Sequence, residues 1–80
     1  MLLHFGTEDN MERQRVISSN VRSIGYDSAS STLEVEFIND GLYQYFNVPG
    51  AVYAAFMRAP SKGSYLANHI KDRYRFRRLR

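Results

Sequence analysis

The fold is decided by residues 32–49, which read TLEVEFINDGLYQYFNVP. The first arm alternates apolar and acidic side chains, with Leu33, Val35 and Phe37 on one side and Glu34 and Glu36 on the other. Successive side chains of a strand point to opposite faces, so this pattern predicts a half-buried strand. The second arm, residues 42–47, is rich in aromatic residues, which favour strands. The intervening Asn-Asp-Gly is typical of hairpin loops, and we predict a β-hairpin.

The loop length sets which residues of the two arms pair. A two-residue loop would place polar side chains opposite aromatic ones on both faces. A three-residue loop, residues 39–41 with Gly41 in a left-handed conformation, pairs Phe37 with Tyr43 and Val35 with Tyr45. We predict the three-residue loop because it gathers one apolar face, made of Leu33, Val35, Phe37, Tyr43 and Tyr45.

The flanking sequence supplies a strand before the hairpin and two helices after it. Residues 20–27 predict a strand, and the short polar residues 27–31 predict the turn that follows. A helix is expected from Pro49 to Arg58, and a second from Lys62 to Lys71 with Ser61 as its cap. The fold class is therefore α+β: a three-stranded antiparallel meander with two short C-terminal helices on one face.

The two ends of the chain are less regular. Residues 1–12 are expected to form a flexible extension of the domain at 13–80, and Met11 is an alternative start. Residues 13–17 could add a short edge strand. The basic C-terminal tail, residues 72–80, could be a second edge strand with Tyr74 and Phe76 docked, or a flexible arm.

Charge is concentrated at the C-terminus. Residues 71–80 hold six basic and one acidic residue, whereas residues 1–70 hold five basic and seven acidic residues. There is no cysteine, no apolar run of membrane-spanning length and no basic start of a secretion signal before Phe5. We expect a soluble cytoplasmic protein without disulfides, cofactors or a membrane partner.

Several short motifs, taken together in order, are similar to one known family. They are Ser18 to Asp27, Leu33 to Phe37, Tyr43-Gln44-Tyr45, Asn47-Val48-Pro49, Ser61 to Tyr65 and Ile70-Lys71. This string resembles the KTSC domain, a small domain found at the C-terminus of some lysyl-tRNA synthetases and as a stand-alone bacterial or phage protein. Tyr43 and Tyr45 match its Tyr-x-Tyr motif, whereas Arg75 stands where members often have Pro. The resemblance implies no established biochemical role, although attachment to a synthetase suggests RNA.

Three groups of residues are candidates for function. The first is a nucleic-acid surface, in which Tyr74 or Phe76 contacts bases and these basic side chains bind phosphates: Lys62, Lys71, Arg73, Arg75, Arg77, Arg78 and Arg80. The second is the pair Tyr43 and Tyr45, which fits a core role better than a stacking platform for bases. The third is Ser61 with Gly63, a helix cap that could also bind an anion. Glu34 and Glu36 would repel phosphate from the other face of the sheet.

The leading functional interpretation is a non-catalytic module that binds RNA, such as tRNA, through the basic surface. The alternative is a protein-interaction module that docks on an acidic or strand-donating partner, and the third is an enzyme of unknown class. Catalysis is disfavoured because His4 and His69 have no metal-ligand spacing. Ser64 and His69 are five residues apart and do not share a helical face. RNA type and oligomeric state stay open, since a meander leaves edges that can pair.

Overall fold

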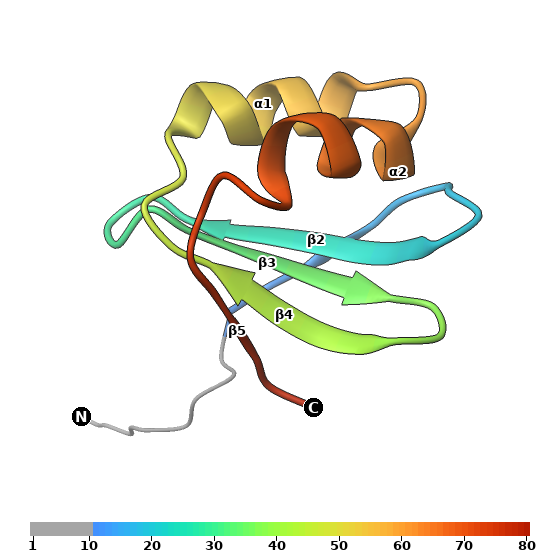
Figure 1. The fold of residues 1–80 in the computed structure, drawn as a ribbon, viewed down its shortest axis with the longest axis horizontal. Helices are drawn as coiled ribbons and strands as arrows, with labels where there is room; N and C mark the ends of the chain where they lie inside the picture. The colour runs from blue at the N-terminus through green and yellow to red at the C-terminus, as the bar shows by residue number, and fades with distance from the viewer. Residues whose placement is uncertain (1–10) are drawn as a thin grey trace.

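The computed structural model describes residues 11–80 (Figure 1). A single antiparallel sheet holds five strands in sequence order. They are β1 (Gln14–Arg15), β2 (Val21–Asp27), β3 (Thr32–Phe37), β4 (Gly41–Tyr45) and β5 (Phe76–Arg78). The helices are α1 (Gly50–Arg58) and α2 (Lys62–Tyr65), and the latter continues into the π-helical turn η1 (Leu66–Ile70). The α+β class is confirmed, but three strands was too few because both ends of the chain join the sheet.

The β3–β4 hairpin has the predicted faces but not the predicted pairs. Val35 lies opposite Tyr43, Leu33 opposite Tyr45 and Phe37 opposite Gly41. The loop has three residues as predicted, but they are residues 38–40, one position earlier. A shift of two positions in the pairing keeps every side chain on its predicted face of the sheet. The predicted apolar face is therefore correct although the predicted pairs are not. Gly41 has the expected positive φ, at 93°.

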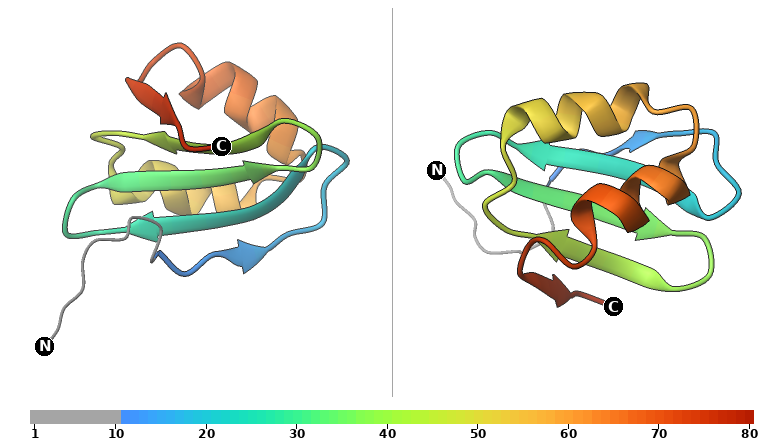
Figure 2. Two further views of the ribbon diagram at one scale, coloured as in Figure 1. Left: turned by 90° about the horizontal axis from the view of Figure 1, so that it is seen from below. Right: turned by 45° about the horizontal axis from the view of Figure 1, so that its top comes forward.

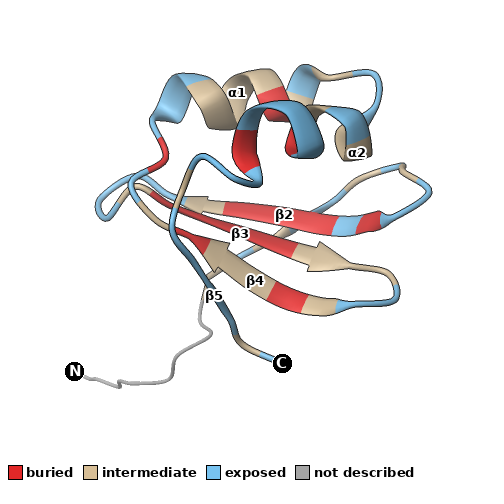
Figure 3. Ribbon diagram, viewed as in Figure 1, coloured by how far each residue is buried: buried red, intermediate tan, exposed pale blue. Residues whose placement is uncertain are grey.

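The helices cover one face of the sheet, as predicted (Figures 1 and 3). Pro49 is the N-cap of α1 rather than its first residue, and Ser61 caps α2 by accepting from the N–H of Ser64 at 3.2 Å. The second helix is not one α-helix: beyond Tyr65 it widens into η1, where the N–H of Lys71 bonds the carbonyl of Leu66. The core between helices and sheet comprises Val21, Ile24, Leu33, Val35, Tyr45, Val48, Phe56, Leu66 and Ile70.

The two ends of the described chain flank the sheet on opposite edges (Figure 2). β1 pairs with β2, and β5 pairs with β4. The N–H of Leu79 donates to the carbonyl of Leu42 at 2.7 Å, so the pairing continues past β5. The basic tail is therefore an edge strand and not a flexible arm. The predicted flexible extension at 1–12 falls mostly outside the described residues.

The helix-free face of the sheet is not the solvated acidic face that the alternation suggested. Glu34 is fully buried there, and Arg13 binds its carboxylate at 2.5 Å. The segment before β1 crosses this face so closely that a Cβ on Gly25 would lie 2.6 Å from the carbonyl oxygen of Glu12. Glu36 accepts from the hydroxyl of Ser23 and is surrounded by arginines. The expected repulsion of phosphate by two bare carboxylates was therefore wrong.

Within residues 11–80, no helix is long and apolar enough to cross a membrane. The same part of the chain contains no group of three or more acidic or histidine side chains that could hold a metal ion.

Candidate nucleic-acid site

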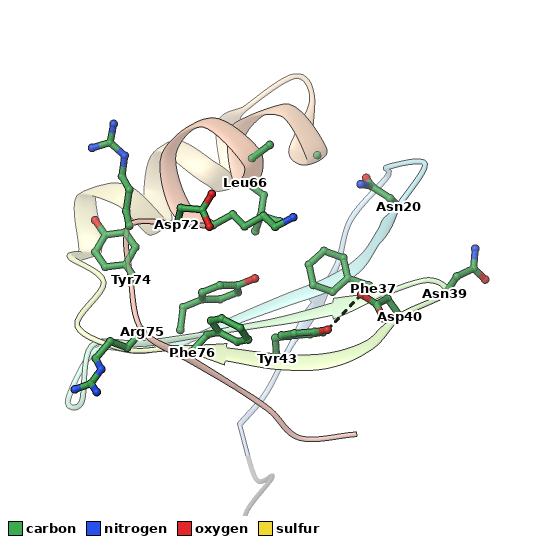
Figure 4. A pocket seen from close by; sticks show the side chains of 15 residues that line it. Asn20, Phe37, Asn39, Asp40, Tyr43, Leu66, Asp72, Tyr74, Arg75 and Phe76 are labelled. Carbon is green, nitrogen blue, oxygen red and sulfur yellow. Dashed lines mark hydrogen bonds between the residues drawn. The ribbon is translucent and has the colours of Figure 1, made fainter.

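A cavity with a volume of about 960 Å³ lies between the helical layer and the β4–β5 edge of the sheet (Figure 4). Leu66 and Asp72 border it from the helical side, and Tyr43 and Phe76 border it from the sheet. Tyr74 and Arg75 lie toward one end, and Asn20 and Asn39 toward the other. A space of this size is in the range of small-molecule and nucleotide sites.

Four aromatic rings form the floor of this cavity: Phe37, Tyr43, Tyr45 and Phe76. The rings of Tyr43 and Tyr45 are nearly parallel, at 18°, with centroids 6.5 Å apart. Phe76 from β5 lies 5.8 Å and 5.9 Å from them, and Phe37 meets Tyr43 edge-on at 5.4 Å. The alternation of β3, β4 and β5 directs these side chains to one face, so the floor is a direct product of strand pairing. Phe76 is 59% exposed, which leaves part of the floor accessible.

The two tyrosines of the Tyr-x-Tyr motif differ in environment. Tyr45 is 4% exposed and belongs to the core, whereas Tyr43 is half-buried and its hydroxyl donates to Asp40 at 3.3 Å. Burial, with smaller contributions from Tyr43, Asp40 and Asp72, raises the pKa of Tyr45 to about 12. Tyr45 is thus a core residue that also faces the cavity, so the two interpretations of the motif are compatible.

Three cations border the cavity: Lys71, Arg73 and Arg75. None of them makes a side-chain hydrogen bond or an ion pair with another described residue. Two carboxylates also line it, those of Asp40 and Asp72. Asp40 is engaged by Tyr43 and lies 3.5 Å from the guanidinium of Arg78, so part of its charge is offset. The rim therefore has cations that are available to bind an anionic group.

The other predicted basic residues have different positions. Arg78 lies over the ring of Tyr43, with its guanidinium carbon 5.5 Å from the centroid, and also pairs with Asp40. Arg80 bonds Glu36 at 3.2 Å on the helix-free face. Arg77 pairs with Gln44 in the β4–β5 register and so shares that face. The tail is therefore divided between the two faces of the sheet and does not form one basic strip.

Lys62 does not extend the basic rim. Its ammonium donates to the carbonyls of Met57 and Ala59 at 3.1 Å and 2.6 Å, and so caps the end of α1. A cation at a helix C-terminus is stabilised by the helix dipole and by the unpaired carbonyls. Lys62 lines a separate, smaller cavity from the one that Lys71 borders, so the two lysines do not line the same cavity.

Ser61 and Gly63 have clear structural roles. Ser61 caps α2, and a Cβ on Gly63 would lie 2.8 Å from the amide group of Asn20, so the glycine permits close packing. Anion binding at this position stays a prediction. His69 packs its ring 4.6 Å from that of Tyr65, at the rim of the helical layer.

Sequence reasoning did not assign Phe37 or Asp72 to a functional site, whereas it considered Phe76, like Tyr74, as a possible contact to bases. Phe37 was expected only as a core residue, and Asp72 only as the one acid in a basic segment. The signal for Phe76 was present, because an alternating edge strand beside Tyr43 and Tyr45 would place it on their face. No comparable signal exists for Asp72, which reaches the cavity only because η1 ends next to it.

Comparisons with known proteins agree with the fold and the motifs. The sequence model of the KTSC domain matches residues 17–74. An uncharacterized protein of Stutzerimonas stutzeri is 40% identical over 86% of this chain and 99% of its own length. A lysine–tRNA ligase of Nostoc punctiforme is 34% identical over 76% of this chain, which spans only 11% of the ligase. The crystal structure of a KTSC domain protein from Yersinia pestis superposes with a TM-score of 0.86 at 41% identity, covering 88% of this chain and 99% of that one. The chain therefore belongs to the KTSC domain family.

Proposed function

We propose that this domain is a non-catalytic module that binds single-stranded RNA in the cavity between η1 and the β4–β5 edge. The observation that carries the proposal is a floor of four aromatic rings bordered by three cations that have no acidic partner among the described residues. Bases would stack on the floor, and phosphates would contact Lys71, Arg73 and Arg75. This combination of stacking and phosphate contacts is the general design of single-strand binding sites.

The energies of the available contacts favour this cavity over the remaining basic surface as the binding site. Stacking of a base on an aromatic side chain is worth about 1–3 kcal/mol, whereas an exposed charge contact alone gives little specificity. The relatives in Nostoc species are lysine–tRNA ligases by name, so the same domain occurs in proteins that act on an RNA. The chain spans 11% of those ligases, and their catalytic activity is not part of the proposal.

The contact set proposed here is narrower than the one the sequence suggested. Lys71, Arg73 and Arg75 are kept because they border the cavity and lack acidic partners. Lys62, Arg78 and Arg80 are left out because the chain itself already uses their side chains. Arg77 lies on the opposite face and would contact only RNA that wraps around the β5 edge.

The test is fluorescence anisotropy of a labelled single-stranded RNA at several salt concentrations. The variant carries three substitutions, Lys71→Gln, Arg73→Gln and Arg75→Gln, and the control is Arg15→Gln on the opposite edge strand, where Arg15 is also exposed. Loss of three phosphate contacts should weaken binding and reduce the slope of log affinity against log salt by about 2. Arg15→Gln should leave both values close to those of the unaltered chain.

The proposal fails if the unaltered chain shows no RNA binding at about 100 mM salt. It also fails if the triple variant lowers the binding free energy by no more than three times the effect of Arg15→Gln, because each charge would then contribute equally and binding would follow net charge and not the cavity.

A further inference from the structure

The hydroxyl of Tyr45 has an unusual position in this cavity. The residue is 4% exposed, yet its hydroxyl makes no hydrogen bond within residues 11–80. No fully buried side-chain nitrogen or oxygen in this part of the chain lacks a partner, so the hydroxyl must open into the cavity that Tyr45 lines. An accessible hydroxyl without a partner in the described chain can bond a water or a ligand in this cavity.

The protonation state of Tyr45 determines what it can bind. With its pKa raised to about 12 by burial, the hydroxyl keeps its proton at neutral pH and can act as a hydrogen-bond donor. The charges of Asp40 and Asp72 raise the pKa further, so both carboxylates lie near enough to act on this hydroxyl. The natural partner of the hydroxyl is a carbonyl or ring-nitrogen acceptor.

Asp72 favours hydrogen-bond donors on a ligand, whereas the Tyr45 hydroxyl favours an acceptor. Its carboxylate lines the cavity and makes no hydrogen bond or ion pair with another described residue. An ionised carboxylate only accepts, so it favours N–H groups and repels a phosphate. The phosphate is therefore directed to the three cations Lys71, Arg73 and Arg75, and the edge of the base is directed to Tyr45 and Asp72.

We propose that the cavity selects guanine in an unpaired nucleotide, with O6 accepting from the Tyr45 hydroxyl and N1–H and N2–H donating to Asp72. This inference rests on the proposed RNA-binding function and names the base that the same site prefers. Guanine offers an acceptor next to two donors. Uracil and cytosine instead place a carbonyl where the carboxylate lies, and adenine offers a single donor group beside a ring acceptor.

Isothermal titration calorimetry of the full chain with ribonucleoside monophosphates tests the inference directly. Guanosine monophosphate should bind roughly 5- to 100-fold more tightly than uridine monophosphate. Inosine monophosphate lacks only the N2 amino group, so it should lose part of that advantage. Asp72→Ala, which leaves no side-chain acceptor, should remove the difference between guanosine and inosine monophosphates.

Tyr45→Phe provides the sharpest variant because the Tyr45 hydroxyl makes no hydrogen bond with another residue in 11–80. We expect roughly tenfold weaker binding of guanosine monophosphate, since an acceptor on the ligand would lose its donor. The matched control is Tyr53→Phe: Tyr53 lies on α1 beside a different cavity, and its hydroxyl also makes no hydrogen bond within the described part of the chain. This control should bind guanosine monophosphate as tightly as the unaltered protein.

The outcomes separate this inference from the proposed function. Salt-dependent RNA binding with equal affinity for all four monophosphates, or unchanged affinity in Tyr45→Phe, overturns the guanine inference and leaves RNA binding in place. Selective binding of guanosine monophosphate without RNA binding supports the nucleotide site and rejects the RNA function. Absence of both kinds of binding rejects both.

Discussion

Arg13 makes it possible to bury a carboxylate in the middle of the sheet. Glu34 is fully buried, and it accepts from Arg13 at 2.5 Å and from the amide of Gln44 at 2.9 Å. Arg13 also donates to Ser23 at 3.0 Å, and Ser23 donates to Glu36. These side chains tie the segment before β1 to three strands. Because the pair is buried, its contribution depends on both partners being present.

Replacement of Arg13 alone should therefore be costly. Arg13→Met removes the arginine that binds the buried Glu34, and we expect the free energy of unfolding to fall by about 3–5 kcal/mol. Urea denaturation measures this change, with Arg15→Met on the exposed strand β1 as the control, expected within about 0.5 kcal/mol of the parent. A double variant, Arg13→Met with Glu34→Leu, should recover much of the loss. Equal stabilities of the two single variants would contradict the account.

Glu36 makes the stability of the fold depend on pH. The hydrogen bond from Ser23 lowers the pKa of Glu36, and the charges of Arg13, Arg22 and Arg80 lower it further against an opposing effect of burial. A lowered pKa in the folded state means that this stabilisation is present above the ordinary value of 4.5 and is lost as pH falls through the folded value. Thermal unfolding between pH 7 and pH 3 should show a smaller acid loss in Glu36→Gln than in the unaltered chain. An identical pH profile in the two proteins would show that Glu36 is not the group responsible.

At the scale of elements, the C-terminal segment depends on one glycine. The N–H of Leu42 donates to the carbonyl of Arg80 at 3.1 Å, which brings the end of the chain against Gly41. A Cβ on Gly41 would lie 1.9 Å from the oxygen of Arg80, and Gly41 also has a φ of 93°. Both the hairpin turn and the docking of the C-terminal segment therefore require a glycine at this position.

Gly41→Ala should both strain the turn and displace the C-terminal segment. We expect a loss of stability of about 1–3 kcal/mol from the backbone conformation alone. Hydrogen exchange of the Leu79 amide, which bonds Leu42, should also become faster in this variant. Gly50→Ala is the control, because its Cβ would meet only the hydroxyl of Tyr26 at 3.9 Å. Unchanged protection of Leu79 in Gly41→Ala would contradict the proposed contact.

The elements that the sequence predicted well are those with a strong local pattern. The alternation in β3 identified the face of the strand that packs against the helices. The Ser61 cap and the apolar face of α1 located the helices. The pairing of the hairpin was wrong by two positions, because hydrophobic alternation fixes the face of a strand but not its partner. The π-helical turn η1 and the burial of Glu34 have no local signature, since each depends on packing between distant segments.

At the scale of the whole molecule, the candidate site is assembled from separate parts of the chain. Phe37 comes from β3, Tyr43 and Tyr45 from β4, Phe76 from β5 and Asp72 from the end of η1. The sequence indicated the basic character and the tyrosine pair, but not that they border one cavity. That arrangement exists only because the C-terminal segment returns to the β4 edge, where it forms β5 with residues 76–78 and a wall of the cavity with residues 74–76.

The most direct test of RNA binding in this cavity is a ¹H–¹⁵N correlation titration of the full chain with a short single-stranded RNA. The account predicts shifts concentrated at the amides around the cavity, among them Tyr43, Tyr45, Leu66, Asp72 and Phe76, with little change along β1 and α1. Shifts concentrated on the helix-free face, or none at saturating RNA, would contradict it.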